Sequence, residues 1–160
     1  MVVKFVPHEK AIRDALSGLL FRDVEIAQGE PVVHSATELA TTAVYVDDRT
    51  ATAAVVIADL PMSAYAGAAI GLIPKGGAEA AIEDRELSPS VKENFDEVLN
   101  VLASLFNAEG EPHVRLYQTF GLKELPPNDL IAISRTLGRR SDLKVTVAGY
   151  GAGRLSVVLA

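Results

Sequence analysis

The longest strongly periodic stretch of apolar residues spans residues 89–108 and predicts an amphipathic helix. Its apolar positions recur at helical spacing and form one stripe: Val91, Phe95, Val98, Leu99, Leu102, Leu105 and Phe106. Ser88 is a suitable N-cap residue, and Pro89 fits the first helical position, where a backbone N–H group is not needed. Gly110 and Pro112 are expected to end the helix.

The opposite side of this predicted helix is polar. About 100° of rotation per residue brings together Glu93, Glu97, Asn100, Ser104 and Asn107. Glu97 and Asn100 are three residues apart, so their side chains are neighbours on the helix surface. Ala103 and Ser104 keep the next turn low in relief. A polar stripe of this kind is most often only a solvated helix face, and that interpretation stays open here.

The other predicted elements are short and mostly joined as hairpins. Strands are expected at residues 24–33, where an interruption near residues 29–31 is one alternative, and at residues 41–46, 51–58 and 113–120, with a closing hairpin of residues 143–148 and 154–159. Further helices are expected at residues 7–21, 61–73 and 128–137. Residues 75–77 predict a turn, and the charged residues 78–87 are expected to be partly helical or mobile.

This order of elements predicts the fold class. Because hairpins dominate over βαβ units, we expect an α+β domain in which helices pack on a mostly antiparallel sheet. Residues 51–58 are apolar almost throughout, which predicts a strand buried on both faces. No shift in composition marks a second domain, so residues 1–160 are expected to form one domain.

Composition narrows the range of functions. The net charge is -6 and no basic block is present, which argues against a nucleic-acid partner. No apolar run reaches the roughly 18 residues of a membrane span, and the absence of cysteine agrees with a cytoplasmic protein. The three histidines, His8, His34 and His113, are far apart, so no metal site is expected.

The polar stripe also carries a family resemblance. The segment DEVLNVLAS, residues 96–104, resembles the Glu-x-x-Asn helix of the CheC/CheX/FliY phosphatases of bacterial chemotaxis. The single motif and the order of elements are more similar to CheX, since CheC would be expected to carry a second motif. The family often has Gly at the position of Ser104, where Ser is still small enough to keep the surface low.

The resemblance implies a protein phosphatase of two-component signalling. Its substrate would be the aspartyl phosphate of a CheY-like response regulator, whose receiver domain would bring its own magnesium, so no cofactor is expected in this chain. Asn100 would hold the attacking water, and Glu97 would pair with a lysine of the receiver. Residues expected to contact the partner are Glu93, Ala103, Ser104 and Asn107.

Two further expectations accompany this hypothesis. The alternative function is a non-catalytic binding module of the same fold, which docks on a receiver or on a flagellar or signalling assembly. The family resemblance also implies a homodimer in which sheets join edge to edge, and long strands such as residues 24–33 and 113–120 agree with an edge that needs a partner.

Overall fold

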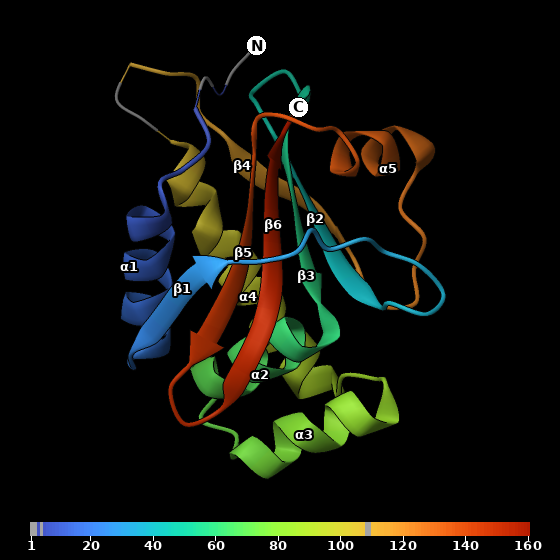
Figure 1. Ribbon diagram of the computed structural model, residues 1–160. Coiled ribbons are helices and arrows are strands. Elements are labelled where there is room, and N and C mark those ends of the chain that lie inside the picture. The colour runs from blue at the N-terminus through green and yellow to red at the C-terminus, as the bar shows by residue number, and fades with distance from the viewer. Residues whose placement is uncertain (1–2, 4, 108–109) are drawn as a thin grey trace.

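The computed structural model describes residues 3, 5–107 and 110–160. They form a six-stranded sheet with the order β1-β5-β6-β3-β2-β4 (Figure 1). Its strands are β1 Val24–Gln28, β2 Ala40–Val46, β3 Thr52–Asp59, β4 Arg115–Phe120, β5 Arg140–Val147 and β6 Gly151–Leu159. All neighbouring strands pair antiparallel, so the predicted α+β class with an antiparallel sheet is confirmed.

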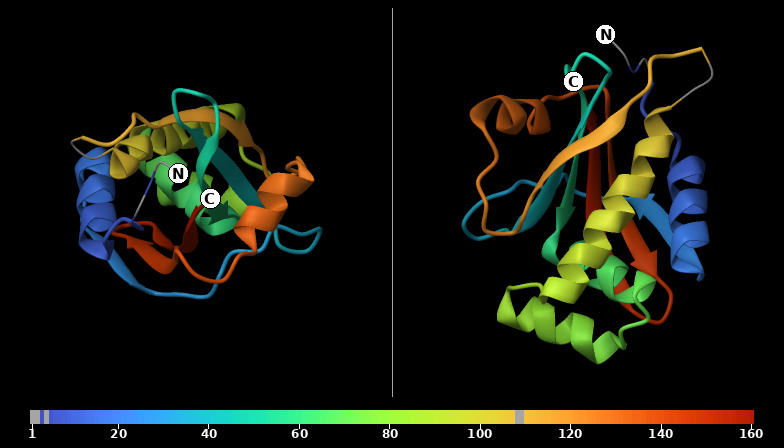
Figure 2. Two further views of the ribbon diagram at one scale, coloured as in Figure 1. Left: turned by 90° about the horizontal axis from the view of Figure 1, so that it is seen from above. Right: turned by 180° about the vertical axis from the view of Figure 1, so that it is seen from behind.

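Helices cover both faces of this sheet. The helical elements are α1 Glu9–Leu20, α2 Leu60–Ile70, α3 Lys75–Asp84, α4 Pro89–Leu102, the 3-10 helix η1 Ala103–Phe106 and α5 Asn128–Ser134. Helices α1, α2 and α4 lie on one face, which we call the inner face, and α3 packs beyond α2 (Figure 2). The other face, the outer face, is covered by α5 and by the segment of residues 29–39.

The core is divided by the sheet into two layers. In β3, Ala54, Val56 and Ala58 face the inner core, whereas Val55 and Ile57 face the outer core. All five of these side chains are buried. The prediction that this strand is buried on both faces is therefore confirmed, and the absence of polar alternation follows directly from the two apolar layers.

The small residues of α2 allow it to pack very closely against its neighbours. A Cβ atom on Gly67 would lie 2.6 Å from the backbone oxygen of Val91 in α4. A Cβ atom on Gly153 in β6 would lie 2.3 Å from the backbone nitrogen of Met62 in α2. Helix α2 therefore serves as a buried spacer that sets how closely α4 approaches the sheet.

The first strand ends at the interruption that the sequence allows near residues 29–31. Strand β1 ends at Gln28 and does not continue to Val33. Gly29 still donates to the backbone oxygen of Asp142 at 3.0 Å, and a Cβ atom there would meet Lys144 N at 2.7 Å. Pro31 then offers no N–H group for a ladder. Residues 29–39 instead cross the outer face, where the Val32 N–H group donates to Ser156 Oγ at 2.9 Å.

The predicted turn at residues 75–77 is wrong, because these residues form the first turn of α3. A side chain at Gly77 would place a Cβ atom 2.8 Å from Ile73 Cγ2, which explains the glycine there. The charged residues that follow complete a regular helix, with Ala78 and Ala81 buried.

Several other boundaries differ from the prediction. The closing hairpin turns at residues 148–150, and Gly151 and Gly153 already belong to β6. Both positions are glycine because Tyr65 and Met62 leave no room for side chains there. Strand β4 begins at Arg115 and helix α5 ends at Ser134. The long helix ends at Leu102 and continues as η1, while its predicted last residue, Ala108, lies outside the described residues.

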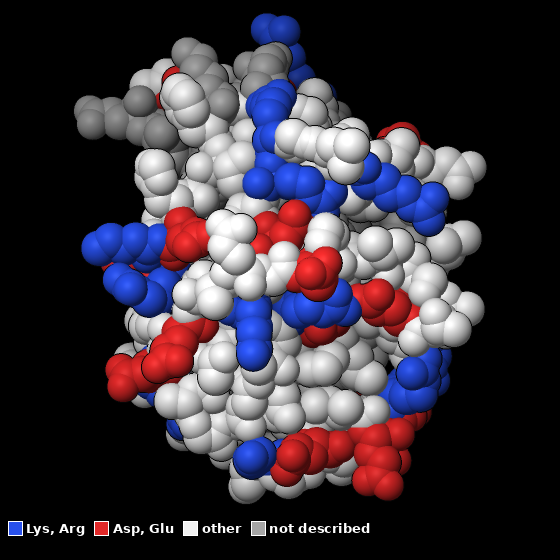
Figure 3. Space-filling view, viewed as in Figure 1, with Lys and Arg blue, Asp and Glu red and all other residues white. Residues whose placement is uncertain are grey.

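An ionic network links residues of the outer face. Asp59 caps α2 through Met62 N at 2.9 Å and accepts from Arg154 Nε at 3.2 Å, and Arg154 also pairs with Glu38. Charges of both signs alternate over this face, and acidic side chains gather at its lower end (Figure 3).

None of the helices among the described residues is both long and apolar enough to pass through a membrane.

Candidate functional site

Helix α4 is fixed at its start and along one side. The Ser88 hydroxyl accepts from Val91 N at 3.2 Å, which confirms the predicted N-cap, and Pro89 occupies the first turn. Its apolar stripe is buried: Val91, Phe95, Val98, Leu99 and Leu102. Gly67 of α2 packs so closely against this stripe that a Cβ atom there would clash with Val91. This close packing fixes the rotation of α4 about its own axis.

The polar stripe of α4 faces solvent, as the helical periodicity predicts. Glu93, Glu97, Asn100 and Ser104 are exposed. Within the described residues, the side chains of Glu97 and Asn100 make no hydrogen bond or ion pair. They lie one turn apart and are free to contact another molecule.

The charge of this stripe is uncompensated. Glu93 and Glu97 are four residues apart, a spacing at which like charges destabilise a helix by about 0.2–0.5 kcal/mol. The neighbouring ion pair, between Lys92 Nζ and Asp96 Oδ2 at 3.2 Å, joins two other side chains of the helix. These two like charges do not help the protein to fold. Such a pair is expected where a cationic group of a partner binds.

The predicted contact residues beyond Asn100 differ in their surroundings. Ala103 is buried and Ser104 is exposed. The Asn107 amide donates to the backbone oxygens of Ala103 and Val114, at 3.2 and 2.9 Å, and accepts from Val114 N at 2.7 Å. Asn107 therefore joins η1 to the segment before β4, and its predicted contact with a partner stays a prediction.

One residue near the site was missed by sequence reasoning. Tyr45 in β2 donates its hydroxyl to the backbone oxygen of Leu99 at 2.6 Å, directly before Asn100 in the chain. Its ring contacts Phe106 of η1, with ring centroids 5.1 Å apart, and burial raises the pKa of the Tyr45 hydroxyl. Nothing local in the sequence indicates this contact, because the two residues are 54 positions apart.

The described residues offer no obvious ligands for a metal of the chain's own. Among them, no three His, Asp or Glu side chains come together as a metal site would require. The polar stripe presents two carboxylates, a carboxamide and a hydroxyl on one exposed helix face. Such groups can orient a water molecule and pair with a cation.

Comparison with known proteins gives matches at the level of structure. Neither the protein-family models nor the curated proteins contain a match to this chain. The FliM middle domain from H. pylori matches with a TM-score of 0.60 and 10% identity, over 94% of this chain and 83% of that one. FliM in a FliG–FliM complex from H. pylori matches with a TM-score of 0.60 and 12% identity, over 94% and 85%.

A third match is a CheX structure. The CheX–CheY–BeF3–Mg2+ complex from Borrelia burgdorferi matches with a TM-score of 0.50 and 9% identity, over 94% of this chain and 93% of that chain. At identities this low the matches establish the fold and nothing finer. The chain therefore has the fold that CheX shares with the FliM middle domain, as its sequence had suggested.

Proposed function

We propose that this protein is a CheX-like phosphatase that hydrolyses the aspartyl phosphate of a CheY-like response-regulator receiver. The observation that carries the proposal is the pair of unpartnered, exposed side chains of Glu97 and Asn100, one turn apart on a rigidly packed helix. The match to a CheX that was solved in complex with CheY supports the choice of partner. A receiver substrate also implies a cytoplasmic location.

The reaction needs little more than placement of water. Phosphoryl transfer proceeds through an in-line arrangement of the attacking and leaving oxygens, so catalysis rests on positioning and on charge stabilisation. The Asn100 amide both accepts from and donates to a water molecule, and it can hold that water in line with the phosphorus atom. Because the catalytic group stands on a convex helix, it can enter the receiver's own active site.

Glu97 contributes recognition in this proposal. Its carboxylate pairs with a lysine of the receiver and fixes the register of α4 on its partner. Glu93, one turn earlier, extends the same negative surface. The receiver supplies the magnesium that its phosphoryl group requires, so this chain contributes only side chains.

A second function is favoured by one specific observation. The fold matches the FliM middle domain with a TM-score of 0.60, higher than the 0.50 of the match to CheX, and FliM was solved in complexes with FliG and with SpeE. The chain would then be a binding module without catalysis. It would dock on a receiver or on a flagellar or signalling assembly through the same exposed helix.

The deciding experiment follows dephosphorylation of phosphorylated receivers with wild-type protein and with Asn100→Ala. We expect the wild type to accelerate the reaction and the variant to lose nearly all of the acceleration. Its free energy of unfolding should change by less than about 0.5 kcal/mol, because the residue is exposed. Asn128→Ala, which removes an exposed amide from α5 on the other face, is the matched control.

The outcomes separate the two functions. Full acceleration by Asn100→Ala would end the catalytic assignment. Wild-type protein that binds a receiver without accelerating dephosphorylation would favour the binding module instead.

A further inference from the structure

A groove lies beside the N-terminal half of α4. Three segments form its walls: residues 85–87, which join α3 to α4, the part of α4 around Phe95, and the loop of residues 121–124 that follows β4. Its volume is about 190 Å³. The residues that line it are Thr41, Arg85, Glu86, Leu87, Lys92, Phe95, Asp96, Gly121, Leu122, Lys123 and Glu124.

The size of the groove limits what it can hold. Pockets for small-molecule ligands begin at roughly 300 Å³, so this groove is too small for a ligand of that kind. Its floor is apolar and consists of Leu87, Phe95 and Leu122, of which Phe95 and Leu122 are buried. A space of this size and lining suits one apolar side chain presented by another protein.

Several charged side chains on the rim of the groove already have a partner within this chain. Lys92 pairs with Asp96 at 3.2 Å, and the Glu124 carboxylate accepts from Gly121 N at 2.9 Å. Arg85 donates to the backbone oxygen of Ala36 at 3.4 Å.

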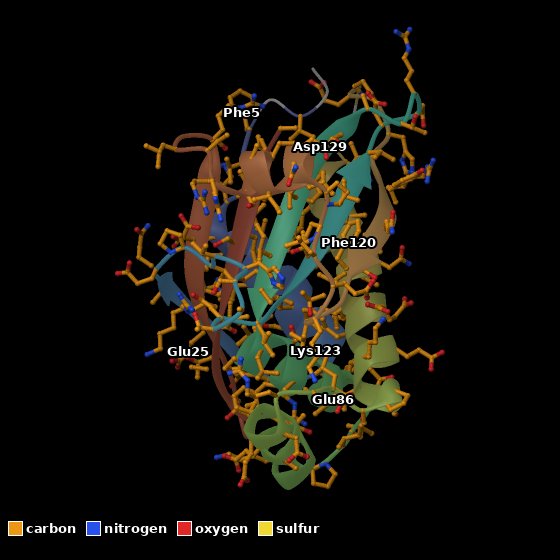
Figure 4. The ribbon with its side chains drawn as sticks, turned by 90° about the vertical axis from the view of Figure 1, so that its right-hand side faces the viewer. Phe5, Glu25, Glu86, Phe120, Lys123 and Asp129 are labelled. Atoms are coloured by element: carbon orange, nitrogen blue, oxygen red, sulfur yellow. The ribbon has the colours of Figure 1, made fainter. Side chains whose placement is uncertain are left out.

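Glu86 and Lys123 are the remaining charged residues of the rim. Within the described residues, neither side chain makes a hydrogen bond or an ion pair. Figure 4 shows both on the side of the molecule where α3, α4 and the loop after β4 meet. A free carboxylate and a free ammonium group thus border the apolar floor.

The groove is continuous with the polar stripe of α4. Lys92, Asp96 and Asn100 follow one another at intervals of four residues, so they form one row along the helix. Asp96, in the wall of the groove, is only about 6 Å along the helix axis from Asn100. A protein that receives Asn100 in its active site must therefore extend over the groove.

We propose that this groove is a specificity site that receives an apolar side chain of the receiver, flanked by a basic residue that faces Glu86 and an acidic residue that faces Lys123. This inference rests on the proposed function, because it assigns the occupant to the same partner. Complementary charges at the edge of an interface set partner choice and affinity, whereas the chemistry depends on Asn100. The groove thus selects which receiver is bound.

The test exchanges the two free charges. The double variant Glu86→Lys/Lys123→Glu keeps the net charge and alters only exposed side chains. With a receiver that wild-type protein dephosphorylates, we expect KM to rise about tenfold while kcat stays within about twofold. The matched control is Glu25→Lys/Lys144→Glu, an exchange of exposed charges on β1 and β5, for which KM and kcat should stay unchanged.

A second variant fills the groove without altering its charge. A Cβ atom on Gly121 would point between the groove walls, 2.9 Å from Glu124 Oε1 and 3.7 Å from Lys92 Cε. Gly121→Leu should therefore raise KM as well, with circular dichroism and thermal melting used to verify that the variant is folded.

The results distinguish this inference from the proposed function. Wild-type acceleration combined with an unchanged KM in folded double and Gly121→Leu variants would overturn the groove assignment alone. A KM increase in both variants, absent from the control, would support it. A panel of receivers that wild-type protein neither dephosphorylates nor binds in the beryllofluoride-activated form would overturn both.

Discussion

The hydroxyl of Tyr45 donates to the backbone oxygen of Leu99 at 2.6 Å and joins the sheet to α4 directly before Asn100. Ala103 N, four residues after Leu99, bonds instead to the carbonyl oxygens of Asn100 and Val101, and the helix tightens into η1 at this point. A residue of β2 thus donates to a buried carbonyl group at the point where the helix type changes. The turn that carries Asn100 is thereby fixed to the sheet.

This contact predicts a stability effect for Tyr45→Phe. Removing the hydroxyl leaves a buried carbonyl oxygen without its partner, which should lower the free energy of unfolding by about 1–3 kcal/mol. Urea unfolding monitored by circular dichroism measures the change. Tyr117→Phe, which alters a 56% exposed tyrosine of β4, is the control and should change it by less than about 0.5 kcal/mol. A Tyr45→Phe protein as stable as the control would refute the assigned role.

A second prediction concerns Glu97. If its carboxylate pairs with a lysine of the receiver, Glu97→Lys should weaken receiver binding by roughly tenfold or more and reduce the salt dependence of association. Titration with a beryllofluoride-activated receiver at several ionic strengths measures both effects. Glu25→Lys makes the same charge change on β1 and should leave the affinity unaltered. Equal affinities for wild type and Glu97→Lys would contradict the docking role.

A third prediction concerns acid stability. Burial alone would raise the pKa of Asp142, but hydrogen bonds from Arg140 and Ser156 outweigh it and hold this pKa below the usual value of 3.8. The carboxylate therefore stabilises the fold above the unfolded pKa, and this contribution is lost as pH falls below about 3.8 through the folded pKa.

The measurement compares urea unfolding of wild type and Asp142→Asn from pH 7 to pH 3. We expect the variant to be less stable at pH 7 and the difference to shrink towards pH 3. Asp48→Asn, in the exposed turn between β2 and β3, should follow the wild-type pH profile. A difference that stays constant across this range would exclude the linkage.

A fourth prediction is the homodimer. Strands β1 and β4 form the two edges of the sheet, and an exposed edge presents unpaired backbone groups that another copy can use. A twofold axis at either edge would leave both α4 helices free for separate receivers. Light scattering at micromolar concentration should give a mass about twice the 17.0 kDa of one chain. A mass near 17.0 kDa at all concentrations would refute the dimer.

The sequence by itself determined the elements whose causes are local. Helix α4 could be predicted from the period of its apolar residues, from Ser88 as N-cap and from Pro89. The same period also predicted which side of the helix is exposed, because it places Glu97 and Asn100 opposite the buried stripe. The continuous apolar run of β3 likewise indicated a strand covered on both sides. Such features depend on neighbours within a few residues, which the sequence displays directly.

Only the tertiary structure decided what depends on residues that are distant in the chain. Three features join segments that share no sequence pattern. They are the contact of Tyr45 with Leu99, the crossing of residues 29–39 over the outer face, and the groove between residues 85–87, α4 and the loop after β4. The glycines at 77, 151 and 153 resemble turn residues in the sequence, yet they lie in α3 and β6. These positions are glycine because neighbouring side chains and backbone occupy the space of a Cβ atom. Close packing between distant elements decides such positions, and local propensity does not report it.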